Sequence, residues 1–172
     1  MESLRRTLDG RAVLIAGLVA GTVFLLALLL LLPALEEVQG TLVLRYIGSL
    51  LLGPDSLTQT DATGLIVGVV VHYALSVLFT LIIAIVVHRW GLLVGVIGGA
   101  ILGLAFYLFN LYTLTAVFEW FFAINSTPLL ISHVLFGAVA GGVYELFDHY
   151  DAGLSTTSTD SFSAATRPGA GS

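Results

Sequence analysis

The chain has 172 residues, of which 58% are hydrophobic and only 10% are charged. Soluble domains carry about 25% charged residues, so this composition is typical of a protein that lies in lipid. The absence of cysteine excludes disulfides, thiolate metal sites and cysteine nucleophiles. With six basic residues and a net charge of −5 the chain has no basic patch for phosphates, and we expect no nucleic-acid partner.

The first predicted element is a membrane span over residues 12–32. Residues 1–11 before it are polar and contain three arginines. The apolar run from 12 to 32 has the roughly 20 residues that cross a bilayer core, and we expect Pro33 to end it. Gly17 and Gly21 form a G-x-x-x-G pair, a spacing that favours close packing between helices in lipid.

The connector over residues 33–63 contains one short apolar segment. Residues 41–52 read TLVLRYIGSLLL, which is too short to span, and Arg45 and Tyr46 interrupt the aliphatic residues. This pattern favours a helix in the membrane interface, with a re-entrant segment as the alternative. Gly53 and Pro54 predict a turn at its end.

A stripe of small and polar residues marks the second predicted span, 64–87. Residues four apart share one face of a helix, and the residues between them are apolar. We therefore expect the stripe to face other helices and the remainder of the surface to face lipid. Every fourth residue along the stripe gives Gly64, Gly68, His72, Ser76, Thr80, Ala84 and His88.

Two further spans carry similar stripes. Gly91 follows the second span directly and predicts a tight antiparallel hairpin to a third span over 92–118, and a turn at 125–128 precedes a fourth span over 128–147. We expect these stripes to pack inside the bundle, with the glycines of the third span as the alternative docking face for another protein. The stripes are Gly95, Gly99, Gly103, Tyr107 and Asn110 in the third span, and His133, Gly137, Gly141 and Glu145 in the fourth.

These elements predict an all-α polytopic membrane protein. The predicted parts are a cytoplasmic N-terminus over 1–11, a four-transmembrane-helix bundle over 12–147 with a short extracytoplasmic interfacial helix, and a disordered cytoplasmic tail over 148–172 that has too little apolar surface to fold. The arginines divide unequally across the membrane, and by the positive-inside rule both termini are cytoplasmic. Arg5, Arg6, Arg11 and Arg89 fall on the side of the tail, and Arg45 falls on the other.

His72, Asn110 and His133 are the candidate functional residues. Polar groups inside lipid are costly and mark functional sites by default. Counted inward from the outer ends of their spans at about 1.5 Å per residue, all three lie at similar depth in the outer half of the membrane. Each shares a helical face with glycines, so we expect them to point into the bundle interior together with Ser76.

Three interpretations of the histidines remain open. In the structural one, they form hydrogen bonds across helices and hold the bundle together, with Asn110, Ser76, Ser132 and Tyr73 as candidate partners. In the second, His72 and His133 are the axial ligands of a haem b, with Ser76 and Gly137 leaving room for the porphyrin.

The third interpretation is a proton or ion path through His72, His133 and Glu145, because histidine titrates near neutral pH. A metal site built from the two histidines and Asn110 lacks carboxylates, and we expect no metal. No serine has a base and an acid at a useful spacing, so nucleophilic catalysis has no support.

The expected function is therefore non-enzymatic: a small structural or accessory membrane protein. Its expected partners are membrane lipid and either another membrane protein or a second copy of the chain. The alternative is a haem-binding or proton-conducting accessory subunit of a redox complex.

Three stretches carry a resemblance to a known family. After the glycine-rich first span, the connector reads LRYIGSLLLG, the second span contains VVHYALSVLF, and the fourth contains ISHVLFGAVAGG. This pattern resembles a family of small four-helix bacterial and archaeal membrane proteins that is catalogued as a domain of unknown function. The resemblance covers residues 12–146 and implies four spans, with a histidine in the second and fourth helices at His72 and His133. It implies no activity.

Overall fold

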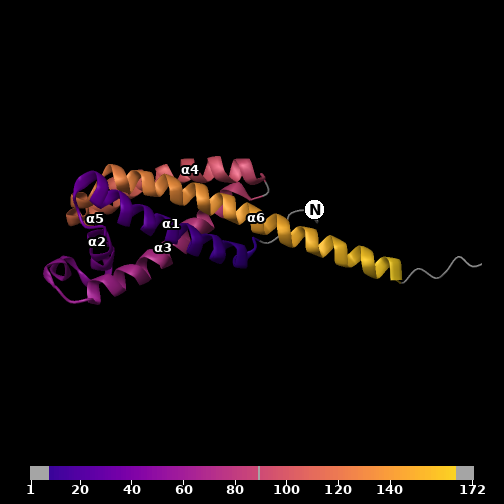
Figure 1. Cartoon of the computed structure of the whole chain (residues 1–172), viewed down its shortest axis with the longest axis horizontal. Coiled ribbons are helices and arrows are strands. Elements are labelled where there is room, and N and C mark those ends of the chain that lie inside the picture. Colours follow the sequence, from indigo (N-terminus) through magenta and orange to yellow (C-terminus); the bar gives the residue numbers. More distant parts are fainter. Residues whose placement is uncertain (1–7, 89, 166–172) are drawn as a thin grey trace, which may run out of the picture.

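The structure is a computed structural model that describes the backbone of residues 8–88 and 90–165, and their side chains except at 122, 124 and 149–165. Within these ranges the chain forms helices and no strand, which confirms the predicted all-α class. Four helices are long and apolar enough to cross a membrane, and they lie side by side along the long axis of the molecule (Figure 1). They are α1 (Gly10–Glu36), α3 (Thr63–Val87), the continuous segment Leu92–Val117, and Thr127–Asp148 within α6.

Shorter elements lie between and within these four helices. The helix predicted in the connector is present as α2, and a one-turn helix follows it before α3. In Figure 1, α2 and α5 lie at the same end of the bundle, opposite the end from which α6 extends. The elements are α2 (Thr41–Leu52), η2 (Pro54–Thr58), α4 (Leu92–Phe109), the π-helical turn η3 (Asn110–Leu114), α5 (Thr115–Val117), η4 (Glu119–Ile124) and α6 (Thr127–Ala165).

Helix α1 begins and ends at identifiable residues. The carboxylate of Asp9 accepts a hydrogen bond from the backbone N–H of Arg11 at 2.8 Å and caps the helix. The prediction that Pro33 ends the helix is wrong by about one turn, since α1 continues to Glu36 and Glu37 follows with a φ of 57°. A proline so close to the end interrupts only one intrahelical hydrogen bond, and the helix can tolerate that loss.

The C-terminal segment also differs from the prediction. Helix α6 continues through residues 148–165, where the sequence composition predicts disorder, and Figure 1 shows this extension running well beyond the bundle. Extending an existing helix needs no new nucleus, and each added residue gains one backbone hydrogen bond. The expected disorder is thus corrected as far as Ala165, and residues 166–172 of the expected tail lie outside the described residues.

The polar stripe of α3 is buried, as predicted from its four-residue spacing. Ser76 is 3% exposed and Thr80 is fully buried, whereas Val70 and Ile85 on other faces are 64% and 60% exposed. Side chains on the outward faces are aliphatic, which is the surface that lipid favours. The small and polar face therefore belongs to the bundle interior.

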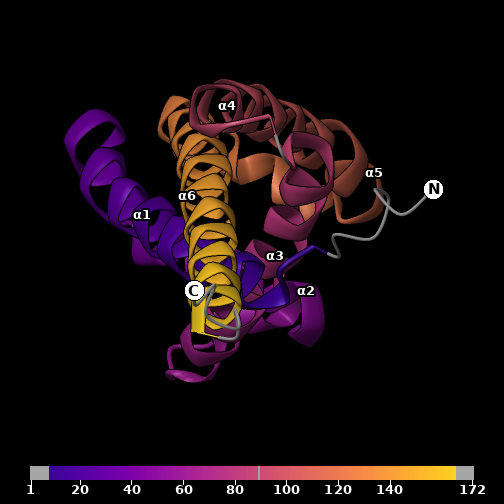
Figure 2. The ribbon, with the colours of Figure 1, turned by 90° about the vertical axis from the view of Figure 1, so that its right-hand side faces the viewer.

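Helix α6 is the central element of the bundle. Figure 2 shows it in the middle, with α4 above it and α1 to one side, and it also contacts α3. Its closest neighbour is α4, because glycines face each other across the contact. A Cβ added at Gly99 would overlap the carbonyl oxygen of Gly137, and one added at Gly137 would overlap that of Gly99. The glycine stripe of α4 is thus covered by α6. The alternative prediction, that this stripe is a docking face for another protein, is therefore wrong.

Glycines also bring α2 against α3. A Cβ at Gly48 would overlap the carbonyl oxygen of Gly64, and a Cβ at Gly68 would overlap that of Leu44. The guanidinium of Arg45 then fixes the following loop, since it donates to the carbonyl oxygens of residues 59 and 61 at 2.9 and 3.0 Å. Helix α2 is therefore part of the packed bundle, at its α5 end.

Substitution of one α4 glycine should separate α4 from α6. We expect Gly99→Ala to lower the free energy of unfolding by about 1–3 kcal/mol, because the added methyl group overlaps backbone that cannot rotate away. Gly98→Ala is the matched control, since its Cβ would meet only a methyl group of Val87, at 3.3 Å. Thermal unfolding in detergent measures both variants, and equal stability of the two would contradict the packing described here.

Candidate functional site

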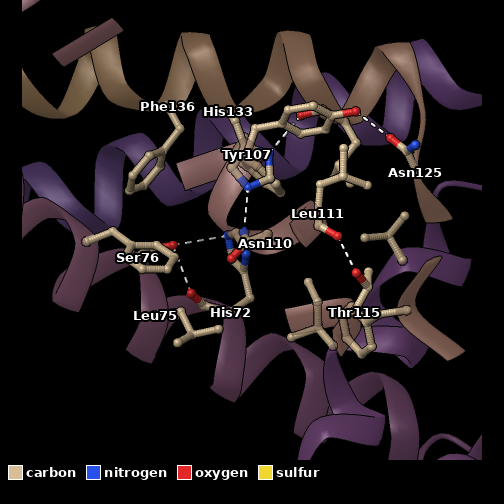
Figure 3. Close-up of a pocket in the computed structure, with 16 residues that line it drawn as sticks. His72, Leu75, Ser76, Tyr107, Asn110, Leu111, Thr115, Asn125, His133 and Phe136 are labelled. Carbon is tan, nitrogen blue, oxygen red and sulfur yellow. Dashed lines mark hydrogen bonds between the residues drawn. The ribbon is translucent and has the colours of Figure 1, made fainter. Parts of the chain in front are cut away.

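Helices α3 and α6 and the turn η3 bring the predicted polar residues together inside the bundle. His72 comes from α3, Asn110 from the first position of η3, and His133 from α6 (Figure 3). The two histidines are 5% and 6% exposed. The ring of Phe24, from α1, lies 5.2 Å from the imidazole of His72 and 4.9 Å from that of His133 between centroids. The three polar residues thus lie close together in the interior of the bundle, and their common depth in a membrane stays a prediction.

These residues line a cavity of about 90 Å³, to which α2 and α5 also contribute lining residues. Its walls are mainly aromatic and aliphatic, with a few polar groups among them. Among the described residues that line it there is no Asp or Glu. The lining residues are Phe24, Val43, Ile47, His72, Leu75, Ser76, Phe79, Tyr107, Asn110, Leu111, Thr115, Phe121, Asn125, Leu129, His133 and Phe136.

The hydrogen bonds of His133 fix both its tautomer and the orientation of Asn110. Nδ1 of His133 lies 2.8 Å from the carbonyl oxygen of Leu129, so Nδ1 carries the proton and donates it. In a neutral imidazole Nε2 is then an acceptor. The side chain of Asn110 lies 3.0 Å from Nε2 and must present its N–H to it. This bond connects α6 to the turn that continues α4. The amide oxygen of Asn110 then points away from Nε2 of His133.

The hydrogen bonds of His72 connect α3 to α1. Nε2–H donates to the carbonyl oxygen of Gly21 at 2.9 Å, with the Ser76 hydroxyl oxygen 3.4 Å away. That hydroxyl donates in turn to the carbonyl oxygen of His72 at 2.8 Å. Of the partners expected from the sequence, Asn110 bonds His133 across helices and Ser76 contacts His72 along α3.

The two other expected partners bond elsewhere. Ser132 donates to the carbonyl oxygen of Pro128 at 2.8 Å, within its own helix. The hydroxyl of Tyr73 pairs with that of Thr22 at 2.9 Å, which forms a second contact between α3 and α1.

The π-helical turn at η3 is the feature of the site that sequence reasoning missed. Such turns are rare and often occur at functional sites. It starts at Asn110 and ends at Leu114, and the hydroxyl of Thr115 just beyond it donates to the carbonyl oxygen of Leu111. The spacing of the stripe gives no signal for it, because the three-residue step from Tyr107 to Asn110 is also ordinary α-helical spacing.

Tyr107 and Asn125 extend the polar contacts toward the surface. The Tyr107 hydroxyl donates to Oδ1 of Asn125, which lies between η4 and α6 and is exposed. Both residues line the cavity. The cavity therefore reaches from the buried histidines to an exposed polar side chain at this end of the bundle.

The residues present do not fit a bis-histidine haem. Haem iron would need a free Nε2 on each imidazole, but Nε2 of His72 donates to Gly21 and Nε2 of His133 accepts from Asn110. Phe24 contacts both imidazoles. The cavity of about 90 Å³ is smaller than the roughly 150 Å³ that admits a single benzene ring, and a porphyrin is far larger.

Glu145, the third member of the alternative proton path, lies near the other end of the apolar part of α6, Thr127–Asp148. Twelve residues separate it from His133, which is roughly 18 Å along a helix. It is 1% exposed, and its carboxylate accepts from the backbone N–H of Gly91 at 3.1 Å. Nearby, the Tyr144 hydroxyl and Nδ1 of His88 share a hydrogen bond at 2.7 Å. These residues form a second polar cluster, which joins the α3–α4 hairpin to α6.

Among the residues that the structure describes, no group of three or more His, Asp or Glu side chains could hold a metal ion. His149, in the acidic run after Glu145, lies outside the described side chains. Comparison of the chain with protein-family models, with curated proteins and with solved structures finds no match. The family resemblance thus stays a prediction.

The bond between Asn110 and His133 should be measurable as a coupling energy. In a double-mutant cycle of Asn110→Leu and His133→Leu, we expect a coupling of about 0.6 kcal/mol and at most about 1.7, the range for hydrogen bonds between helices in lipid. Tyr73→Phe with His133→Leu is the matched control, because those side chains share no hydrogen bond and their effects should add. Unfolding in mixed micelles gives both values, and equal coupling in the two cycles would contradict the bond.

Proposed function

We propose that this chain is a non-catalytic membrane protein of structural or accessory type, in which the buried histidines hold the helices of the bundle together. One observation carries the proposal: each imidazole forms a hydrogen bond to a helical element other than its own. His72 connects α3 to α1, and His133 connects α6 to the turn after α4. The Nε2 atoms that could have bound a haem iron therefore form hydrogen bonds between helices instead.

The close packing of glycines supports the same proposal. G-x-x-x-G contacts place backbones together and leave no open channel between α4 and α6 at Gly99 and Gly137. The two polar clusters, around His133 and around Glu145, lie toward opposite ends of the apolar part of α6, Thr127–Asp148. This separation favours two anchoring points over one continuous path for protons.

We propose further that both termini face the cytoplasm, which places the α2 and α5 end of the bundle outside. The support is the division of arginines, although Arg5, Arg6 and Arg89 lie outside the described residues. Arg11 lies at the start of α1. Arg45 lies on α2, which follows the other end of α1. Lipid is the proposed partner of the outward aliphatic faces, and another membrane protein or a second copy would have to dock there.

Single cysteines test this orientation cleanly, because the chain has none. Gly10→Cys adds a side chain in open space at one end of the bundle, and Thr60→Cys lies at an exposed position at the other. We expect a membrane-impermeant maleimide added to intact cells to label only Thr60→Cys, and to label both after lysis. Labelling of Gly10→Cys alone in intact cells would invert the proposed topology.

An absorption spectrum tests the non-redox proposal. We expect protein purified in mild detergent with haem supplied to show no Soret band, oxidised or dithionite-reduced, because neither Nε2 is free. His72→Gln and His133→Leu should change thermal stability and leave the spectrum unchanged. A Soret band in the unaltered protein that either substitution removes would contradict the proposal.

A further inference from the structure

One ring nitrogen of His72 forms no hydrogen bond. Both nitrogens of His133 are engaged, and so is Nε2 of His72, but Nδ1 of His72 has no hydrogen-bond partner among the described residues. Since Nε2 carries the proton that is donated to Gly21, Nδ1 is an acceptor in the neutral ring. A buried acceptor without a donor is costly, and such a group in a native structure calls for an explanation.

A small molecule can reach this nitrogen from the cavity. Three other polar atoms of the described interior also lack a partner, but their neighbours cover them completely: Oγ1 of Thr80, Nε2 of His88 and Oδ1 of Asn110. Nδ1 of His72 is not covered in this way. His72 lines the cavity and is only 5% exposed, so the uncovered nitrogen opens into the cavity. In Figure 3 its imidazole lies among the side chains that surround this space.

The polar groups around the cavity determine the chemistry of a ligand. Nδ1 is an acceptor, so the ligand must bring an O–H or N–H donor. Among the described lining residues no carboxylate is present to balance a cation, and a buried unpaired charge is very costly, so the donor must be neutral. The lining hydroxyls of Ser76, Tyr107 and Thr115 donate to other groups of the protein. A strong acceptor on the ligand, such as a carbonyl oxygen, therefore finds no hydroxyl donor there.

The size and the walls of the cavity narrow the choice further. A cavity of roughly 150 Å³ holds benzene, which has six non-hydrogen atoms, so in the same proportion a cavity of this size holds about three or four. A water molecule needs two to four polar partners, whereas the walls here are mainly aromatic and aliphatic around a volume of about 90 Å³. A donor that also has a short alkyl chain therefore fits the cavity better than water does.

We propose that this cavity binds a short aliphatic alcohol, of the size of ethanol or propanol. Its hydroxyl donates to Nδ1 of His72, and its alkyl chain packs against the lining aromatic rings, among them Phe24, which already contacts the imidazole at 5.2 Å between centroids. The bond from Nε2 of His72 to Gly21 and the bond between Asn110 and His133 both remain. The assignment goes beyond the scaffold role, because it gives the cavity a ligand and breaks no hydrogen bond between helices.

Two probes of nearly equal shape test the proposal on the intact chain in detergent. 2-Fluoroethanol has the hydroxyl donor, and 1-fluoropropane has a methyl group in its place. By ¹⁹F NMR titration, with empty micelles as the reference for partition into detergent, we expect saturable binding of the alcohol. Its affinity should be roughly tenfold higher than that of 1-fluoropropane, the ratio for one satisfied buried acceptor. Absence of saturable binding, or equal affinity for the two probes, would overturn the proposal.

Three variants locate the binding. Leu75→Phe fills the cavity and should abolish binding, whereas Leu78→Phe, on the exposed face of the same helix, should leave it unchanged. His72→Phe keeps an aromatic ring but removes the acceptor, so it should erase the preference for the alcohol. Binding that survives Leu75→Phe, or a preference that survives His72→Phe, would contradict the assignment. If a variant does not fold, the comparison of the two probes on the unaltered chain still decides.

A second measurement reports on the nitrogen itself and needs no variant of the cavity wall. In protein labelled with ¹⁵N at histidine, ethanol should move the resonance of Nδ1 of His72 saturably and leave both nitrogens of His133 nearly unchanged, because those are already engaged. An Nδ1 resonance that does not move would show that the site holds water instead or stays closed, and would overturn the proposal.

Discussion

The contact between α4 and α6 is the constraint on which the rest of the structure depends. Hydrophobic side chains do not drive helices together in lipid, so close packing of backbones must do it. Gly99 and Gly137 face each other with no room for a Cβ on either side. Because α6 also contacts α1 and α3, the position that these glycines impose on α6 determines where its polar residues meet the other helices.

The position of the polar site follows from this placement of α6 against α4. One contact further along the same face, a Cβ at Gly103 would overlap the carbonyl oxygen of His133. The imidazole of His133 is therefore held close to the end of α4, where Asn110 lies within hydrogen-bond distance at the start of the π-helical turn. The cavity forms where α1, α3, η3 and α6 converge.

The two ends of the bundle have different polar chemistry. Around the cavity near the α2 and α5 end, the polar groups are imidazoles, hydroxyls and amides. At the other end, the carboxylate of Glu145 and the pair of Tyr144 and His88 fasten the α3–α4 hairpin to α6. Both clusters connect helices, which supports a scaffold role for each. The first cluster also lines a cavity of about 90 Å³.

The amino-acid sequence by itself determined the four apolar helices, the short connector helix and the buried face of α3. Those features depend on composition and on four-residue spacing, which are local properties of the chain. It also identified His72, Asn110 and His133 as interior residues. Spacing did not reveal that α6 continues to Ala165, because helix extension depends on the preceding helix rather than on local composition.

Only the tertiary structure decided which contacts the polar residues make. The sequence left scaffold, haem and proton path open for the two histidines, since all three need polar groups on an interior face. The proposed scaffold role is supported by which nitrogen of each imidazole is engaged, by the position of Phe24 and by the size of the cavity. These are relations between residues on different helices, set by how closely the glycines let the backbones approach, and no pattern within a single helix contains them.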